Sequence, residues 1–346
     1  MTIVEVDRAV TGGVDTHLDL HWAAALDQRG ALLGTECFPA SLEGYRALVA
    51  WLREFGTLDK VGVEGTGAYG AGLARYLADE GIGAIEVDRP NRQSRRRLGK
   101  SDTIDAIEAA RAALSGRATG VPKDHNSSIE AIRVLMVAKR SATRARTKTI
   151  TQMRQLSYTA PEQLRCRLKG LPIEVFVAEA QRLRPHPSGD VVICATKAAL
   201  LSLASRVRGL EAEITKLDGQ LTPLVTGAAP ELLALYGVGI DTAATLLVAA
   251  GDNPERLRSE AAWARLCGVA PKQASSGQVT RYRLDRGGNR QANSALFRIV
   301  LVRLACDPET KGYMERRLGE GKSKLEVIRI LKRYVAREVH RTLPRG

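Results

Sequence analysis

The first ninety residues alternate apolar and polar positions in a way that is typical of short strands separated by helices. Residues 10–38 follow this alternation and carry a hairpin signal at Asp27–Gly30, so they predict three strands in a meander. The pattern then predicts, in order, a helix over 42–52, a strand at 61–63 that ends on Glu64, a helix over 71–80 and a strand near 82–87. This succession, followed by a further helix, is that of an RNase H-like α/β domain.

Four acidic residues fall where that fold would bring them together. Asp15 lies in the first strand and Glu64 closes the fourth. Asp102 and Asp105 stand three apart at the start of a helix that Ser101 can cap, so they share one face. Each acid alone has an ordinary explanation, as a turn, strand-end or helix-start residue. Their coincidence in one fold favours a common site.

Paired carboxylates repel each other, and a divalent cation is one way to stabilise them. Oxygen ligands suit Mg²⁺, with Mn²⁺ as an alternative. His17 and His21 are four apart in a strand region, where that spacing is less apt for a metal than on a helix, so we interpret them as ordinary strand histidines. Residues 89–100 add a strip of cations that would attract phosphate: Arg89, Arg92, Arg95, Arg96, Arg97 and Lys100.

Composition points to a polyanionic partner. Lys and Arg outnumber Asp and Glu by 52 to 38, which gives a net charge of +14. No segment has the length and apolarity of a bilayer span and the N-terminus lacks the features of a signal peptide, so nucleic acid is favoured over a membrane and a cytoplasmic location is expected, nucleoid-associated on DNA. The five cysteines have no CxxC pair, which argues against a zinc site and against a disulfide framework.

The middle of the chain predicts long helices. A capping box at Ser127–Glu130 opens a helix whose continuation, over 139–154, is strongly basic; it is either a solvated face or a rod along nucleic-acid phosphates. Leucine-rich heptads over 200–224 predict a coiled coil closed by Pro223 and Gly227. Its partner is either the preceding helix or a second protomer.

The last region is predicted to be mainly helical. The Gly-x-Gly turn within 235–247 resembles a helix-hairpin-helix that can hold a phosphate. Without its basic surroundings, a tight helix–helix turn that needs small residues would be the favoured interpretation. A loop follows that holds Ser275 and Ser276 before Gly277. We therefore predict three domains, over 1–124, 125–228 and 229–346.

Several motifs together resemble those of the DEDD transposases of the IS110 family of insertion sequences. They are Gly13-Val-Asp15, Glu64-Gly-Thr-Gly67, Lys100-Ser-Asp-Thr-Ile-Asp-Ala106, Gly237-Val-Gly-Ile-Asp-Thr-Ala243, and Gly268-Val-Ala-Pro271 with Ser276-Gly277 and Gly288-Asn289-Arg290. The resemblance covers about residues 10 to 305. Two positions depart from the family pattern: Arg286-Gly287 replaces a frequent Lys-Arg pair, and Tyr236 replaces a frequent proline.

The resemblance implies a RuvC-like domain in which Asp15, Glu64, Asp102 and Asp105 bind magnesium. It implies a coiled-coil middle and a C-terminal domain whose serine attacks DNA. We interpret Ser276 as this nucleophile because it directly precedes glycine, with Ser275 as the alternative. It further implies a structured bridge RNA that pairs with donor and target DNA, and a homo-oligomer, a dimer or a tetramer.

The predicted function is therefore that of a DNA transposase or recombinase working through a phosphoserine. Two alternatives are a metal-dependent junction nuclease that uses water and a non-catalytic nucleic-acid-binding protein. The cationic residues predicted to contact nucleic acid are Arg92, Arg95, Arg96, Arg97, Lys100, Arg140, Arg144, Arg146, Lys148, Arg281, Arg283, Arg286 and Arg290.

Overall fold

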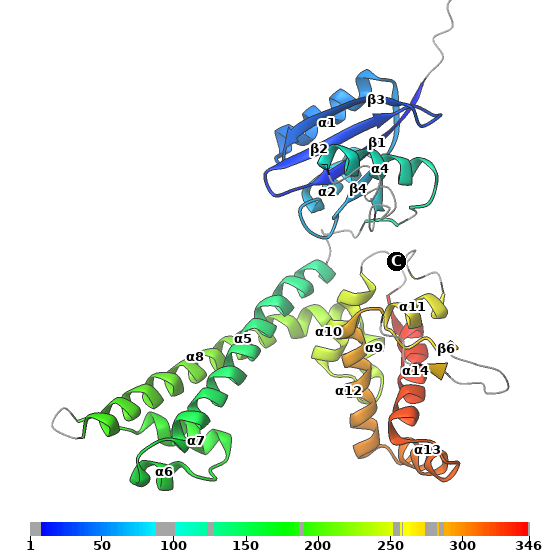
Figure 1. Cartoon of the computed structure of the whole chain (residues 1–346). Helices are drawn as coiled ribbons and strands as arrows, with labels where there is room; N and C mark the ends of the chain where they lie inside the picture. Colours follow the sequence, from blue (N-terminus) through cyan, green and yellow to red (C-terminus); the bar gives the residue numbers. More distant parts are fainter. Residues whose placement is uncertain are drawn as a thin grey trace, which may run out of the picture. The chain divides into compact units, whose positions relative to one another are not determined.

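The computed structural model describes residues 8–87, 101–118, 120–122, 128–186, 190–251, 257, 259–273, 282–283 and 287–344. The chain divides into two compact units (Figure 1). The first lies within residues 1–127, with 250–259. The second comprises residues 128–249 and 260–344. Among the described residues, every helix is too short or too polar to cross a bilayer.

The first unit is built on a five-stranded sheet in the order β3-β2-β1-β4-β5. The strands β1 (Ala9–Thr16), β2 (Leu20–Leu26) and β3 (Leu32–Pro39) are antiparallel, which confirms the predicted meander. The strands β4 (Thr57–Glu64) and β5 (Gly83–Val87) run parallel to β1. The hairpin forms because Asp27 Oδ1 accepts hydrogen bonds from the backbone amides of Arg29 and Ala31, while Gly30 adopts a positive φ of 85°.

Helices cover both faces of this sheet. Apolar residues on one face of β1 and β4, among them Val14 and Val63, pack with α1 (Leu42–Glu54) and α2 (Ala71–Asp79). The other face is covered by α4 (Asp102–Leu114). The mixed α/β architecture predicted for the N-terminal region is thus confirmed.

Two glycines allow α4 to lie unusually close to the sheet. Gly13 of β1 and Gly62 of β4 are partners across the strand pair. A Cβ on Gly13 would lie 2.2 Å from the backbone nitrogen of Ala110, and a Cβ on Gly62 would lie 2.5 Å from the carbonyl oxygen of Ala109. The helix meets them with the small, buried face of Ala106, Ala109, Ala110 and Ala113. Backbone-to-backbone packing of this kind fixes the position of α4 relative to β1 and β4.

The second unit starts with two long helices, α5 (Ser128–Tyr158) and α8 (Val191–Ala228), that pack against each other. They run antiparallel, because Arg146 pairs with Glu211 and Lys139 pairs with Asp218. The heptad segment therefore packs within the chain, against the basic helix. The short helices α6 (Glu162–Leu168) and α7 (Ile173–Gln181) complete a core with them that includes Met153, Phe176 and Leu200.

The predicted end of the heptad helix is wrong at Pro223 but lies within one residue of the observed end at Gly227. The helix continues through Pro223 and Gly227 to Ala228. Proline removes one backbone donor from a helix interior, but Leu221 and Val225 on either side of it are fully buried. Their packing stabilises the helix across the proline.

The rest of the second unit is mainly helical, as predicted. Its elements are α9 (Pro230–Ala234), α10 (Ile240–Ala250), α11 (Glu260–Leu266), the two-residue strands β6 (Lys272–Gln273) and β7 (Tyr282–Arg283), α12 (Arg290–Cys306), α13 (Pro308–Gly319) and α14 (Lys324–Thr342). The predicted hairpin turn falls between α9 and α10, where Gly237 has a φ of 80°. Ser275 and Ser276 fall between β6 and β7 in the chain and lie outside the described residues.

Candidate metal centre

The carboxylates predicted from the sequence lie on the sheet face that α4 covers. Successive side chains of a strand alternate between faces, so Asp15 shares the face of Gly13, and Glu64 shares the face of Gly62. Because Gly13 and Gly62 are partners, Asp15 and Glu64 lie at neighbouring strand ends. The hydroxyl of Thr16 ties these ends together by donating to the carbonyl oxygen of Glu64 at 2.7 Å.

The turn after Glu64 is also fixed to the sheet. Gly65 has a positive φ of 72°, which favours glycine. The hydroxyl of Thr66, one residue later, donates to Glu86 Oε1 on β5 at 2.9 Å. The glycine-rich turn thus holds the end of β4 in place.

The first turn of α4 carries the other two acids. Ser101 has the extended conformation of an N-cap residue, but its side chain makes no capping hydrogen bond, so the predicted cap is confirmed in position only. Asp102 is partly exposed, whereas Asp105 is buried. The positive end of the helix dipole stabilises both carboxylates.

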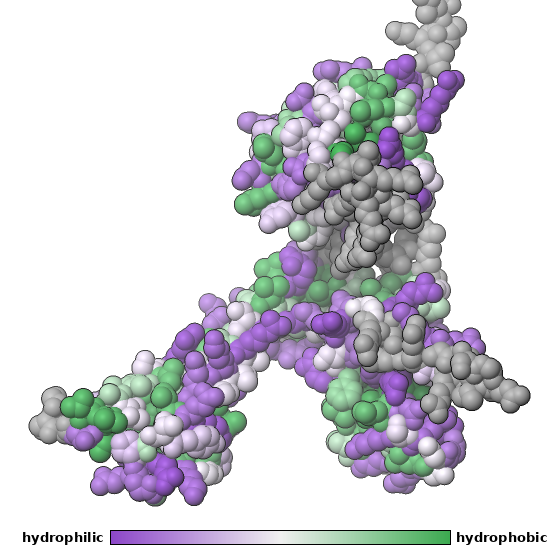
Figure 2. All heavy atoms as spheres, in the orientation of Figure 1, coloured by the Kyte–Doolittle hydropathy of each residue, from purple (hydrophilic) through white to green (hydrophobic). Residues whose placement is uncertain are grey.

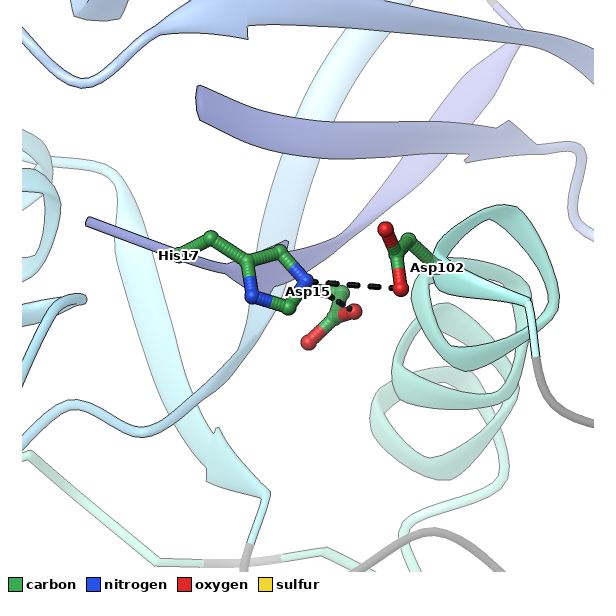
Figure 3. A group of neighbouring side chains, drawn as sticks. All are labelled: Asp15, His17 and Asp102. Atoms are coloured by element: carbon green, nitrogen blue, oxygen red, sulfur yellow. Dashed lines mark hydrogen bonds and ion pairs between the residues drawn. The ribbon is translucent and has the colours of Figure 1, made fainter. Parts of the chain in front are cut away.

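A histidine stands between two of these acids (Figure 3). His17 Nε2 lies 3.2 Å from Asp15 Oδ2 and 3.4 Å from Asp102 Oδ1. One ligand atom from each of these three residues falls within 4.8 Å of the others, which is close enough to share one cation. Within the described part of the chain, Glu64 and Asp105 are not in this group.

The predicted placement of His17 in a strand is therefore wrong, and its part in a metal site stays a proposal. The strand ends at Thr16, and His17 turns toward Asp15, two residues earlier on the same side. The spacing Asp-x-His at a strand end is the signal that could have found it. For His21 the ordinary interpretation is confirmed, since its ring is buried and stacks on Tyr45 at 5.6 Å between centroids.

The electrostatics of Asp15 suit a cation site. Burial raises the pKa of Asp15 above its ordinary value, and the charges of Asp105 and Asp102 raise it further. His17 opposes this rise, through its charge and its hydrogen bond. A divalent cation would lower the pKa of Asp15 again, because its charge stabilises the ionised carboxylate. Hard carboxylate oxygens are the ligands that Mg²⁺ and Mn²⁺ prefer.

Some of the cations predicted to contact nucleic acid have partners inside the second unit. The guanidinium of Arg140 donates to Gln291 Oε1 and to Thr245 Oγ1, and Arg146 pairs with Glu211 at 2.7 Å. Arg144, Lys148 and Arg290 are exposed. Arg283 lies in β7, and the others fall outside the described residues: Arg92, Arg95, Arg96, Arg97, Lys100, Arg281 and Arg286.

Known protein families match this chain in two places. Residues 12–157 match the DEDD transposase family of IS110 elements, described as "Transposase". Residues 229–315 match the "Transposase IS116/IS110/IS902 family". The first match contains all four predicted acids, and the second contains both predicted serines.

Two curated proteins are similar over part of their length. The "Insertion element IS110 uncharacterized 43.6 kDa protein" of Streptomyces coelicolor is 33% identical over 140 residues, which is 40% of this chain and 33% of that protein. The "Insertion element IS900 uncharacterized 42 kDa protein" of Mycobacterium paratuberculosis is 27% identical over 134 residues, 38% of this chain and 34% of that protein. The chain thus aligns with about a third of the length of each relative. The two family matches cover residues in both units of the chain. The chain belongs to the IS110 family of insertion-element transposases.

Proposed function

We propose that this protein is a DNA transposase that cuts and rejoins DNA strands at a divalent-metal site on its first unit. The observation that carries the proposal is the meeting of Asp15 and Asp102 across His17, with the buried Asp105 close enough to raise the pKa of Asp15. Family membership supports DNA as the substrate.

The fold of the first unit supports an RNase H-like, RuvC-like assignment. Its sheet order, with three antiparallel strands followed by two parallel ones, fits that fold. Asp15, Glu64, Asp102 and Asp105 would hold Mg²⁺, with Mn²⁺ as the alternative. When bound, the metal would supply stabilisation of the charge that develops on the attacked phosphate. His17 would orient Asp15 and Asp102 by its two contacts.

The nucleophile is proposed to be Ser276, with Ser275 as the alternative. Its hydroxyl oxygen would attack a backbone phosphorus, form a phosphoserine and release the 3′ or 5′ oxygen of the broken strand as a hydroxyl. Attack by the hydroxyl of another strand would reverse these bonds and free the serine. One phosphoester replaces another at each step, so rejoining requires no external energy source.

Target choice is proposed to come from a structured bridge RNA that pairs with donor and target DNA. The protein would then read the shape and backbone of nucleic acids rather than their sequence. The high positive charge of the chain, +14, supports this role. We further propose that the protein acts as a homo-oligomer, a dimer or a tetramer.

Covalent trapping tests this function. The full chain, incubated with Mg²⁺, DNA carrying the element's ends and the RNA transcribed from them, is denatured and examined for a protein–DNA adduct. The wild type should form it; a Ser275→Ala/Ser276→Ala double variant should not. Asp102→Asn should lose at least about 100-fold in cleavage, as expected when charge stabilisation at a phosphate is removed.

Asp79→Asn is the matched control, because Asp79 is an exposed acid of the same unit. It should cleave as the wild type does. Cleavage that persists in the double serine variant without an adduct would identify a nuclease that uses water. Normal cleavage by Asp102→Asn would contradict the metal site.

A further inference from the structure

Polar side-chain contacts join the long helix α5 to the helices α10 and α12. Lys139 of α5 is buried, and its ammonium binds Asp218 of α8 and Asp241 of α10. Next to it, Arg140 donates to Thr245 Oγ1 of α10 at 3.1 Å and to Gln291 Oε1 of α12. Two successive residues of α5 thus connect this helix to three others of the second unit, α8, α10 and α12.

Two further arginines extend from this junction into solvent. Arg144 lies four residues after Arg140 and so on the same face of α5. Arg298 lies seven residues after Gln291 and so on the same face of α12. Burial lowers the pKa of the Arg140 guanidinium, the charges of Arg144 and Arg298 lower it further, and the charge of Asp241 raises it by less. The hydrogen bond from Arg140 to Gln291 links the two helices, and Arg144 and Arg298 stand on the faces of α5 and α12 that carry this bond.

The acids at the junction offset the charge of this cluster only in part. Asp218 and Asp241 are both bound to Lys139. Within the described part of the chain, neither Arg144 nor Arg298 pairs with a carboxylate, and both side chains are exposed. Like charges held together without a counter-ion favour a bound anion. Figure 2 shows hydrophilic side chains over much of the visible face of the long helical pair.

We propose that Arg144 and Arg298 form a clamp that holds the phosphate backbone of a nucleic-acid strand where α5 meets α12. Arg140 is a positioning residue: it bonds to Gln291 and Thr245 within the protein, and these bonds set the distance between the two helices. Guanidinium groups match phosphate oxygens in geometry and keep their charge, so the site suits phosphodiesters better than a single small anion. The clamp rests on the proposed function, because it assumes that nucleic acid is the partner.

Salt-dependent binding of the full chain tests the clamp. Labelled duplex DNA and labelled duplex RNA are titrated with protein in EDTA, at several potassium chloride concentrations. Arg144→Gln and Arg298→Gln should each weaken binding and reduce the slope of log K against log salt by about 1, the value for one lost phosphate contact. Arg144→Lys should keep the wild-type slope, because the charge remains. If the variants weaken binding to only one of the two probes, the clamp is assigned to that nucleic acid.

The matched control is Arg206→Gln. Arg206 is exposed on α8, beyond the Arg146–Glu211 pair and so farther from the junction. It should leave the slope unchanged. The clamp is overturned if Arg144→Gln and Arg298→Gln bind both probes with the wild-type slope, or if Arg206→Gln lowers the slope as much as they do.

Because EDTA removes metal-dependent cleavage, the two proposals fail separately. Unchanged slopes in the arginine variants, together with cleavage that depends on Asp102, would remove the clamp and leave the transposase. Reduced slopes in a protein that forms no adduct and cleaves no DNA would keep the clamp and remove the catalytic proposal.

Discussion

Asp15 is the residue on which the metal site depends most. Its side chain is buried and lies near two other carboxylates, which disfavours its charged form. His17 offsets this effect only in part, so the pKa of Asp15 is raised. Without a cation, the folded protein therefore binds a proton at Asp15 more readily than the unfolded chain does. The same burial that makes Asp15 costly as a charge makes it a strong position for a metal ligand.

This imbalance predicts how stability depends on pH in metal-free protein. The folded pKa of Asp15 lies above its ordinary value of 3.8. Its contribution to the free energy of unfolding is therefore greatest below that value and is lost as the pH rises through the folded pKa. Urea unfolding in EDTA should show that Asp15→Asn removes this decline and is more stable than the wild type at neutral pH. An equal decline in both proteins would contradict the buried, repelled carboxylate.

His17 shows what a residue-scale pattern can and cannot reveal. The four acids were found because each stands at a recognisable strand end or helix start. His17 contacts Asp102, which is 85 positions away, and no local pattern encodes such a contact. The same holds for Arg146, whose partner Glu211 lies 65 positions away, so its basic helix could not be told from a wholly solvated one.

At the scale of elements, the packing of α4 on two paired glycines decides where Asp102 lies. The alternating pattern predicted the strands, and the capping pattern predicted the start of α4. The close approach itself could not be predicted, because a glycine in a strand has several explanations until its neighbour across the sheet is known. The prediction that Pro223 ends its helix was wrong for the opposite reason. Proline disfavours a helix locally, but the buried residues on both sides of it stabilise the helix.

A single methyl group should test this packing. Gly13→Ala would place a carbon 2.2 Å from the backbone of Ala110, so α4 must move. We expect the free energy of unfolding to fall by about 1–3 kcal/mol, as for other overpacked cores. DNA cleavage should fall by about 100-fold, because Asp102 and Asp105 move with the helix.

Gly83→Ala is the control for this prediction. Gly83 lies in the same sheet, but its added carbon would come no closer than 3.7 Å to Asp59. It should cleave DNA normally. Normal cleavage by Gly13→Ala as well would show that α4 does not set the geometry of the site.

At the scale of the whole molecule, the two units divide the proposed chemistry. The carboxylates belong to the first unit, and the segment with the two serines belongs to the second. The first family match covers most of the first unit and continues into the second, and the other match lies mainly in the second unit. The order of elements, the basic charge and the motifs of both units were readable from the sequence, because each is local or compositional. How α5, α10 and α12 meet depends on side chains far apart in the chain, and only the structure revealed that junction.

Binding of Mn²⁺ to the full chain, measured by electron paramagnetic resonance, tests the central claim without any nucleic acid. The free-ion signal should fall as wild-type protein is added, and the Asp79→Asn control should behave in the same way. The Asp15→Asn/Asp102→Asn double variant should leave most of the free-ion signal intact, because both carboxylates that face His17 are then neutral. A double variant that is folded and binds Mn²⁺ as tightly as the wild type would contradict the assignment of the metal to this site.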